Sequence, residues 1–112
     1  IRDYIHVVDL ARGHVAAVEK LFHPSSAAQH DKINLGTGKG HSVKEALAMF
    51  SQACGFEIPF EVVARRPGDI ASCVADVARA SRLLDWNATF SFEQMCLDHW
   101  SFQRQVAKRE MR

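Results

Sequence analysis

Hydrophobic and polar positions follow two different spacings along the chain, and together they predict an α/β protein. Short β-branched or aromatic runs over residues 4–8, 33–35 and 60–64 are typical of strands. Apolar residues three or four positions apart predict helices between and after these runs. The resulting order, strand–helix–strand–helix–strand–helix–helix, indicates an α/β domain.

Capping residues and prolines set the expected ends of the first helix. Asp9 can cap a helix over about residues 10–22, and Pro24 should stop it. The small and polar residues 25–32 are then expected to form a loop.

The remaining helices carry comparable signals. Ser42-Val43-Lys44-Glu45 and Ser91-Phe92-Glu93-Gln94 have the spacing of capping boxes, and Gly55 is placed to end the helix that the first box opens. Asp76 can cap a short helix to about Leu84. The last helix should fray in its charged tail. Both long helices present an apolar face, formed by Val43, Leu47, Phe50 and Cys54 in one and by Phe92, Met95, Cys96, His99, Phe102 and Val106 in the other.

Length and charge limit the classes of function. With 112 residues, 47% of them hydrophobic, the chain can form one modest domain. A formal net charge of +1 predicts no general attraction to nucleic acid or to a membrane. No apolar run approaches the roughly 20 residues of a membrane span. The start at Ile1, directly before a predicted strand, leads us to expect a fragment of a longer protein.

Cysteine and histidine spacings indicate neither a metal site nor a disulfide framework. Cys54, Cys73 and Cys96 are odd in number and lack a Cys-x-x-Cys spacing, which fits a reducing, cytoplasmic compartment. The six histidines do not cluster with carboxylates as metal ligands would. We also find no serine elbow and no supported Cys–His pair.

A glycine-rich turn over residues 36–42 leaves two interpretations open. Its backbone N–H groups, at a predicted strand-to-helix junction, could hold a phosphate. It is not a P-loop, because position 40 is Gly rather than Ser or Thr and position 33 is Ile rather than Gly. The favoured alternative is a tight turn that lets the next helix pack closely.

Two arginine-bearing segments are the strongest candidates for chemistry. Arg2 precedes the first predicted strand, and Arg65-Arg66-Pro67-Gly68-Asp69 follows the third. A pair of guanidinium groups suits a diphosphate, because the planar fork binds phosphate oxygens bidentately and stays charged. A solvated turn around Pro67 and Gly68 is the plain alternative.

Four motifs occur in an order that points to a known family. They are residues 2–11 (RDYIHVVDLA), residues 34–38 (NLGTG) with Ser42-Val43, residues 65–69 (RRPGD) and residues 84–86 (LDW). From Arg2 to about Gln103, the chain resembles the C-terminal third of the UDP-glucose 4-epimerases, which are extended short-chain dehydrogenases/reductases. The resemblance implies that residues 1–112 form a C-terminal UDP-sugar-binding region. The N-terminal NAD-binding Rossmann domain would be missing, and one or two strands here could complete its sheet.

The resemblance also implies roles for single residues. Arg2 and Arg66 would hold the two phosphates of a UDP-sugar, and Asp69 would accept from the ribose hydroxyls. Tyr4 and Val43 would line the nucleotide pocket.

Cys73 matches a position that borders the sugar in this family, where some members carry tyrosine. A small side chain there should admit an N-acetyl group, so both UDP-hexoses and UDP-N-acetylhexosamines are expected substrates. A free thiol that only packs is the alternative.

The implied activity is epimerisation at C4 through a 4-keto intermediate formed with NAD, in a cytoplasmic homodimer. The acid/base machinery of the family, Tyr-x-x-x-Lys, is absent: Tyr4 is the only tyrosine and Val8 follows it by four. No catalytic, cofactor-binding or metal-binding residue is therefore expected here, and the chain alone should be inactive. The alternatives are a fragment of a nucleotide-sugar dehydratase or decarboxylase, a non-catalytic nucleotide-sugar-binding module, and a purely structural fragment.

Overall fold

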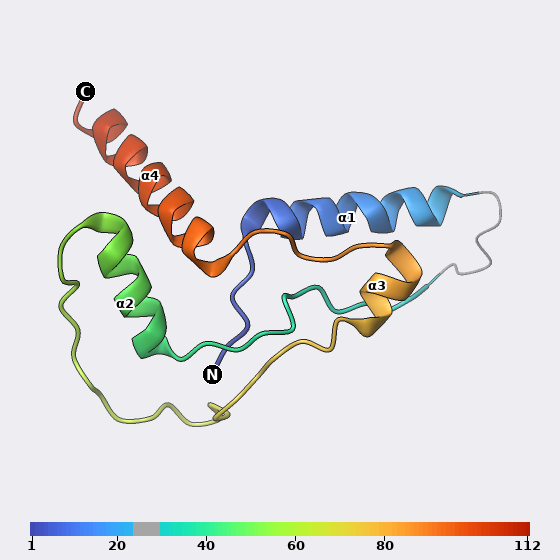
Figure 1. Ribbon diagram of the computed structural model, residues 1–112, viewed down its shortest axis with the longest axis horizontal. Helices are drawn as coiled ribbons and strands as arrows, with labels where there is room; N and C mark the ends of the chain where they lie inside the picture. The colour runs from blue at the N-terminus through green and yellow to red at the C-terminus, as the bar shows by residue number, and fades with distance from the viewer. Residues whose placement is uncertain (24–29) are drawn as a thin grey trace.

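The described part of the chain contains four helices and long segments without regular secondary structure (Figure 1). The computed structural model describes residues 1–23 and 30–112. The helices are α1 (Val7–Phe22), α2 (Val43–Cys54), α3 (Ala78–Leu84) and α4 (Phe92–Glu110). α1 packs with α3, and α2 packs with α4. The two pairs lie apart in Figure 1, with the N-terminal segment between them.

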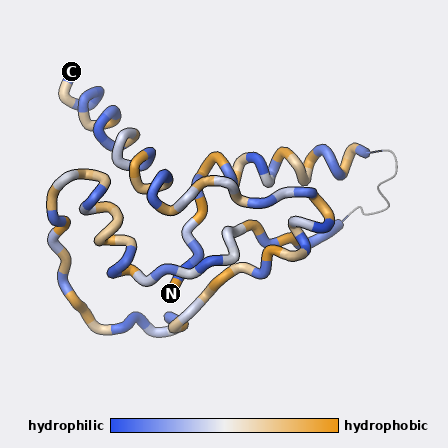
Figure 2. The backbone as a smooth tube through the Cα atoms, in the orientation of Figure 1, coloured by the Kyte–Doolittle hydropathy of each residue, from blue (hydrophilic) through white to orange (hydrophobic). Residues whose placement is uncertain are grey.

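The described chain is more open than a domain of its length usually is. Its radius of gyration is 17.4 Å, against about 13 Å expected for a compact domain of this size. Among the described residues, the buried apolar side chains are few, namely Ala46, Ala80, Trp86 and Cys96. Large apolar residues such as Phe22 and Val62 are more than 80% exposed. Hydrophobic positions recur along α1 and along the extended segment between α2 and α3 (Figure 2).

The three predicted strands are not found in the described residues. Residues 33–35 and 60–64 are extended but unpaired, and the run over residues 4–8 bends into a helix. β-type pairing in the described ranges consists of two isolated bridges, from Arg2 to His41 and from Arg2 to Cys73. The predicted strands are therefore not confirmed, because a strand requires a neighbouring strand and the described residues offer none to these segments.

The first helix begins earlier than predicted. His6, not Asp9, is its N-cap, and the Nδ1 atom of His6 accepts from the backbone N–H of Val8 at 3.0 Å. The Nε2 atom of His6 lies 3.0 Å from the carboxylate of Asp98 on α4. The His6 ring therefore accepts a backbone N–H of the first turn of α1 and also contacts α4. For this reason the apolar run over residues 4–8 leads into a helix and not into a strand.

Because Asp9 does not cap the helix, its carboxylate can join α1 to the segment before α4. It is fully buried and accepts from the N–H groups of Thr89 and Phe90 at 3.0 and 2.9 Å. Arg12 adds an ion pair at 2.9 Å. Burial alone would raise the pKa of Asp9, but these hydrogen bonds and Arg12 outweigh burial and lower the pKa below its ordinary value. The backbone carbonyl of Asp9 also accepts from the Trp86 indole at 3.1 Å.

The predicted ends of α2 are confirmed. Ser42 and Glu45 form a reciprocal capping box, with bonds of 3.1 and 2.6 Å. Gly55 ends the helix at a φ of +83°, which a glycine adopts without strain.

The caps of α3 and α4 are confirmed in part. Asp76 accepts from the N–H of Ala78, although Val77 is the N-cap. Ser91 caps α4, but Gln94 donates to Asp98 instead of closing a capping box. α4 continues to Glu110, so the predicted fraying of its tail is wrong.

Part of one prediction lies outside the described residues. Pro24 and residues 25–29, most of the predicted loop, are not among them. Within the described ranges, no helix has both the length and the apolar character to cross a bilayer.

We predict that Asp9→Asn lowers the free energy of unfolding at pH 7 by about 1–3 kcal/mol, because charge-assisted hydrogen bonds are lost in a buried site. A carboxyl group with a lowered folded pKa stabilises the fold above its unfolded pKa of about 3.9 and loses that contribution as pH falls through the folded pKa. The difference between wild type and variant should therefore shrink below about pH 4. Urea unfolding from pH 7 to pH 3 measures it. The exposed Asp76→Asn is the control, and a pH-independent difference would contradict the prediction.

Candidate functional site

Arg2 is held where three segments of the chain meet. Its backbone N–H and C=O pair with His41 at 2.9 and 2.8 Å. The Nη1 atom of Arg2 donates to the carbonyl oxygens of Ile1 and Ile70, at 2.8 and 3.0 Å. Both side-chain partners are neutral, and within the described ranges no carboxylate pairs with Arg2. The guanidinium group therefore keeps its net charge for another anion.

The second arginine segment forms a β-turn that presents Arg66 and Asp69 together. The N–H of Asp69 bonds to the carbonyl of Arg66 at 3.2 Å, and Gly68 between them has a φ of +85°. The Nε atom of Arg66 lies 3.0 Å from Oδ2 of Asp69. Arg66 is 82% exposed, so its remaining N–H groups face solvent. The plain interpretation, a solvated turn, therefore describes the local geometry.

The structure brings Arg2 and the Arg66–Asp69 turn into one neighbourhood. The carbonyl that Arg2 contacts belongs to Ile70, the residue after Asp69. Three residues further on, the N–H of Cys73 bonds to the carbonyl of Ile1 at 3.0 Å. Four of the six predicted site residues therefore lie in or beside one stretch, residues 66–73. The Cys73 thiol is exposed and unbridged.

Tyr4 and Val43 lie on the other side of Arg2. Tyr4 stacks on Phe92 with ring centroids 5.4 Å apart, and His41 stacks on the same ring at 4.3 Å. These rings border a hollow of about 440 Å³. Val43, 60% exposed, begins α2 two residues after His41. The contacts of the described residues do not join Val43 to Tyr4 directly.

The glycine-rich turn cannot hold a phosphate with its backbone. The Thr37 N–H donates to Oδ1 and Oδ2 of Asp3 at 3.0 and 3.1 Å, and the Gly38 N–H donates to Oδ2 at 2.9 Å. A carboxylate already fills the anion position. The tight turn is therefore confirmed, but its close neighbours belong to residues 1–3 and 74–77 and not to the next helix. The turn does not fit the phosphates of a nucleotide cofactor.

Asp3 is the site residue whose contacts the sequence did not reveal. Beyond the turn, its carboxylate accepts from the Thr37 hydroxyl at 2.6 Å and from the Ala75 N–H at 3.3 Å. Burial would raise the pKa of Asp3, but these bonds and that of Gly38 outweigh burial and lower the pKa below its ordinary value. Its position beside Arg2 was the single available signal, because partners 34 and 72 residues away have no local signature.

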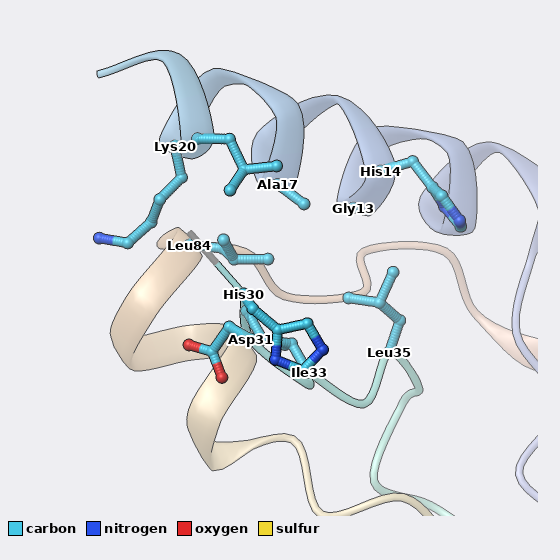
Figure 3. Close-up of a pocket in the computed structure, with 10 residues that line it drawn as sticks. Gly13, His14, Ala17, Lys20, His30, Asp31, Ile33, Leu35 and Leu84 are labelled. Carbon is cyan, nitrogen blue, oxygen red and sulfur yellow. The ribbon is translucent and has the colours of Figure 1, made fainter. Parts of the chain in front are cut away.

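A second hollow, of about 370 Å³, lies away from all six predicted site residues. Figure 3 shows it between α1, residues 30–35 and the end of α3, with Ala17, Leu35 and Leu84 around it. Its lining is largely apolar. No arrangement of groups there suits a diphosphate.

Sequence and structural comparisons relate the chain to proteins that were solved with UDP-containing ligands. No protein-family model matches the chain. The UDP-glucose 4-epimerase of Bacillus subtilis is 52% identical over 103 residues, which cover 92% of this chain and 30% of that protein. A solved UDP-glucose 4-epimerase of Stenotrophomonas maltophila, with bound NAD and formylated UDP-arabinopyranose, is 42% identical with a TM-score of 0.87. It is matched over 96% of this chain and 31% of its own.

A third relative agrees. The Bifidobacterium longum UDP-glucose 4-epimerase, in complex with NAD⁺ and UDP, is 41% identical with a TM-score of 0.78, over 92% of this chain and 30% of its own. The chain spans about a third of the length of the relatives it matches. In sequence and structure, the chain is therefore similar to the C-terminal part of the UDP-glucose 4-epimerases.

Proposed function

We propose that this chain supplies the diphosphate-binding half of the substrate site in a UDP-glucose 4-epimerase. The reaction would interconvert UDP-glucose and UDP-galactose through a 4-keto intermediate. The relatives' names support the reaction, and the geometry around Arg2 supports the part that this chain plays in it.

One observation carries the proposal. The Arg2 guanidinium, without a carboxylate partner in the described ranges, contacts the segment that follows the Arg66–Asp69 turn at 3.0 Å. This contact supports the proposal that two guanidinium groups from distant parts of the sequence bind one ligand. A diphosphate carries two negative groups with planar sets of oxygens, and paired arginines bind such groups bidentately.

The geometry of the remaining predicted residues supports the proposed site less directly. Asp69 is 35% exposed, and its pairing with Arg66 leaves acceptor capacity for the ribose hydroxyls of a nucleotide. Tyr4 borders the aromatic hollow near Arg2, where a nucleotide pocket is proposed. Val43 would line the same pocket from the start of α2.

The NAD cofactor would be bound outside this chain. The relatives crystallised with NAD are about three times longer, and the glycine-rich turn here is occupied by Asp3. NAD would accept and return the hydride at C4. The residues of this chain would bind and orient the nucleotide end of the substrate, so the chain alone should not epimerise it.

We also propose that unpaired segments of this chain complete the sheet of a Rossmann domain. The extended residues 33–35 border the apolar hollow beside α1, which a packed sheet would cover. Residues 60–64 are extended and exposed, as unpaired strands are. Amide hydrogen exchange tests this idea: both segments should exchange more slowly in the full native polypeptide than in the chain alone.

The whole protein is proposed to be a cytoplasmic homodimer. Three free thiols suit a reducing compartment, and the resemblance to the family supports the dimer. Light scattering on the full native polypeptide gives its mass, and a monomer would contradict the proposal.

We expect Arg2→Ala in the full native polypeptide to weaken UDP binding by about 10- to 100-fold, because charge-assisted hydrogen bonds to phosphate are lost. Arg66→Ala should weaken it similarly. Calorimetric titration with UDP measures both. Arg104→Ala, an exposed arginine on α4, is the matched control. Unchanged affinity in both site variants would refute the diphosphate site.

Product analysis separates the rival reactions. An epimerised UDP-hexose supports the proposal, whereas a dehydrated or decarboxylated sugar identifies the alternative enzyme class. Binding of UDP-sugar without turnover would leave a binding module.

Cys73 is proposed to set the size of the accepted sugar. Its exposed thiol lies in the stretch beside Arg2, and its backbone is fixed to the N-terminal segment. A small side chain on a fixed backbone leaves volume that an aromatic ring would fill. The room should accept an N-acetyl group next to the diphosphate site.

We predict that Cys73→Tyr lowers turnover of UDP-N-acetylhexosamines by about tenfold or more, in the range expected when a pocket loses the volume for a substituent. Turnover of UDP-glucose and UDP-galactose should persist. Cys73→Ala, which keeps the space, should leave both substrate pairs active. Unchanged N-acetyl activity in Cys73→Tyr would mean that the thiol only packs.

A further inference from the structure

The Asp3 carboxylate connects the three segments that meet around Arg2. It lies on the N-terminal segment and accepts from Thr37 and Gly38 in the glycine-rich turn. Its bond to Ala75 reaches the third segment, two residues beyond Cys73. No ion pair of Asp3 occurs in the described ranges, so N–H and O–H dipoles balance its charge.

The segments around Asp3 approach each other closely. A Cβ atom on Gly36 would lie 2.5 Å from the Ala75 Cβ and 2.7 Å from Oδ2 of Asp3. A Cβ atom on Gly40 would lie 2.4 Å from Ile1 and 2.8 Å from Val74. Such contacts are too short for real atoms, so glycines are needed at both positions. The three segments are therefore in direct contact.

This arrangement bears on the substrate-facing groups through the backbone. Asp3 follows Arg2 directly, so fixing one carboxylate fixes the peptide that carries the guanidinium group. The same carboxylate anchors residue 75, and the Cys73 N–H then meets the Ile1 carbonyl at 3.0 Å. The contact of Arg2 with Ile70 lies three residues before Cys73 in the same segment.

We propose that Asp3 is a positioning residue that sets the placement of Arg2 and of residues 70–75 for binding the substrate diphosphate. The proposal rests on the function proposed above, in which Arg2 binds that diphosphate. Asp3 itself does not touch the ligand. It holds the Arg2 guanidinium group and residues 70–75 in one arrangement before the ligand binds. This reduces the entropic cost of ordering them on binding.

Asp9 provides a matched control for loss of stability. It is also a carboxylate that accepts from a threonine N–H, the same threonine's hydroxyl and a neighbouring N–H, here those of Thr89 and Phe90. It joins α1 to the segment before α4, and its hydrogen bonds and ion pair in the described ranges are made with residues 12, 86, 89 and 90. Asp3→Asn and Asp9→Asn therefore remove equivalent charges, but only one of them lies beside Arg2.

The experiment measures UDP affinity, KM, kcat and melting temperature in the full native polypeptide. Asp3→Ala should raise the Kd for UDP by about tenfold, the equivalent of about 1.4 kcal/mol, and should raise KM more than it changes kcat. Asp3→Asn, which keeps one acceptor oxygen, should give a smaller increase. Asp9→Asn should lower the melting temperature without changing the Kd.

Each other outcome has a defined meaning. An unchanged Kd in folded Asp3→Ala overturns the proposal, and so does an equal rise in Kd for Asp9→Asn, which would show a general loss of stability. If Asp3→Ala does not fold, Thr37→Val removes the 2.6 Å bond to Asp3, together with two bonds of the same hydroxyl to the Lys39 backbone, and an unchanged Kd there and in Asp3→Asn overturns the proposal. Arg2→Ala in the same series tests the underlying function: a loss there without an effect at Asp3 refutes only the positioning role.

Discussion

Backbone N–H groups that no strand pairs must find other acceptors, and two aspartate carboxylates provide them in this chain. Asp9 accepts from residues 89 and 90, and Asp3 accepts from residues 37, 38 and 75. A carboxylate offers about four acceptor positions and so can join several segments at one point. In an open chain with few covered apolar side chains, these two centres fix the positions of the extended segments.

The two centres stabilise different parts of the structure. Asp9, with Trp86, joins α1 to the segment that leads into α4. Asp3 joins the three segments around Arg2, where the closeness of the chains requires Gly36 and Gly40. A glycine-rich sequence that resembles a phosphate-binding loop is therefore used for close packing around an internal carboxylate.

The two arginines of the site differ in their partners. Within the described ranges, Asp3 accepts from N–H and O–H groups and Arg2 has no carboxylate partner, whereas Arg66 pairs with Asp69 in its own turn. In the proposed site, both arginines would bind phosphate, and Arg66 would also hold Asp69 in place. Similarity to UDP-glucose 4-epimerases gives this arrangement a chemical meaning, since a UDP-sugar carries both a diphosphate and a ribose.

The sequence by itself determined the features that depend on neighbouring residues: the Ser42–Glu45 box, the Gly55 stop, the Ser91 cap and the motifs that indicate the family. These require contacts within one helical turn, or only residue identity. Tertiary structure decided that residues 4–8 do not form a strand, because His6 caps α1 and contacts Asp98, and that residues 33–35 and 60–64 stay unpaired. It also decided the role of Asp3, whose partners lie up to 72 residues away. Strand pairing and carboxylate placement depend on which distant segments meet, and no local pattern contains that information.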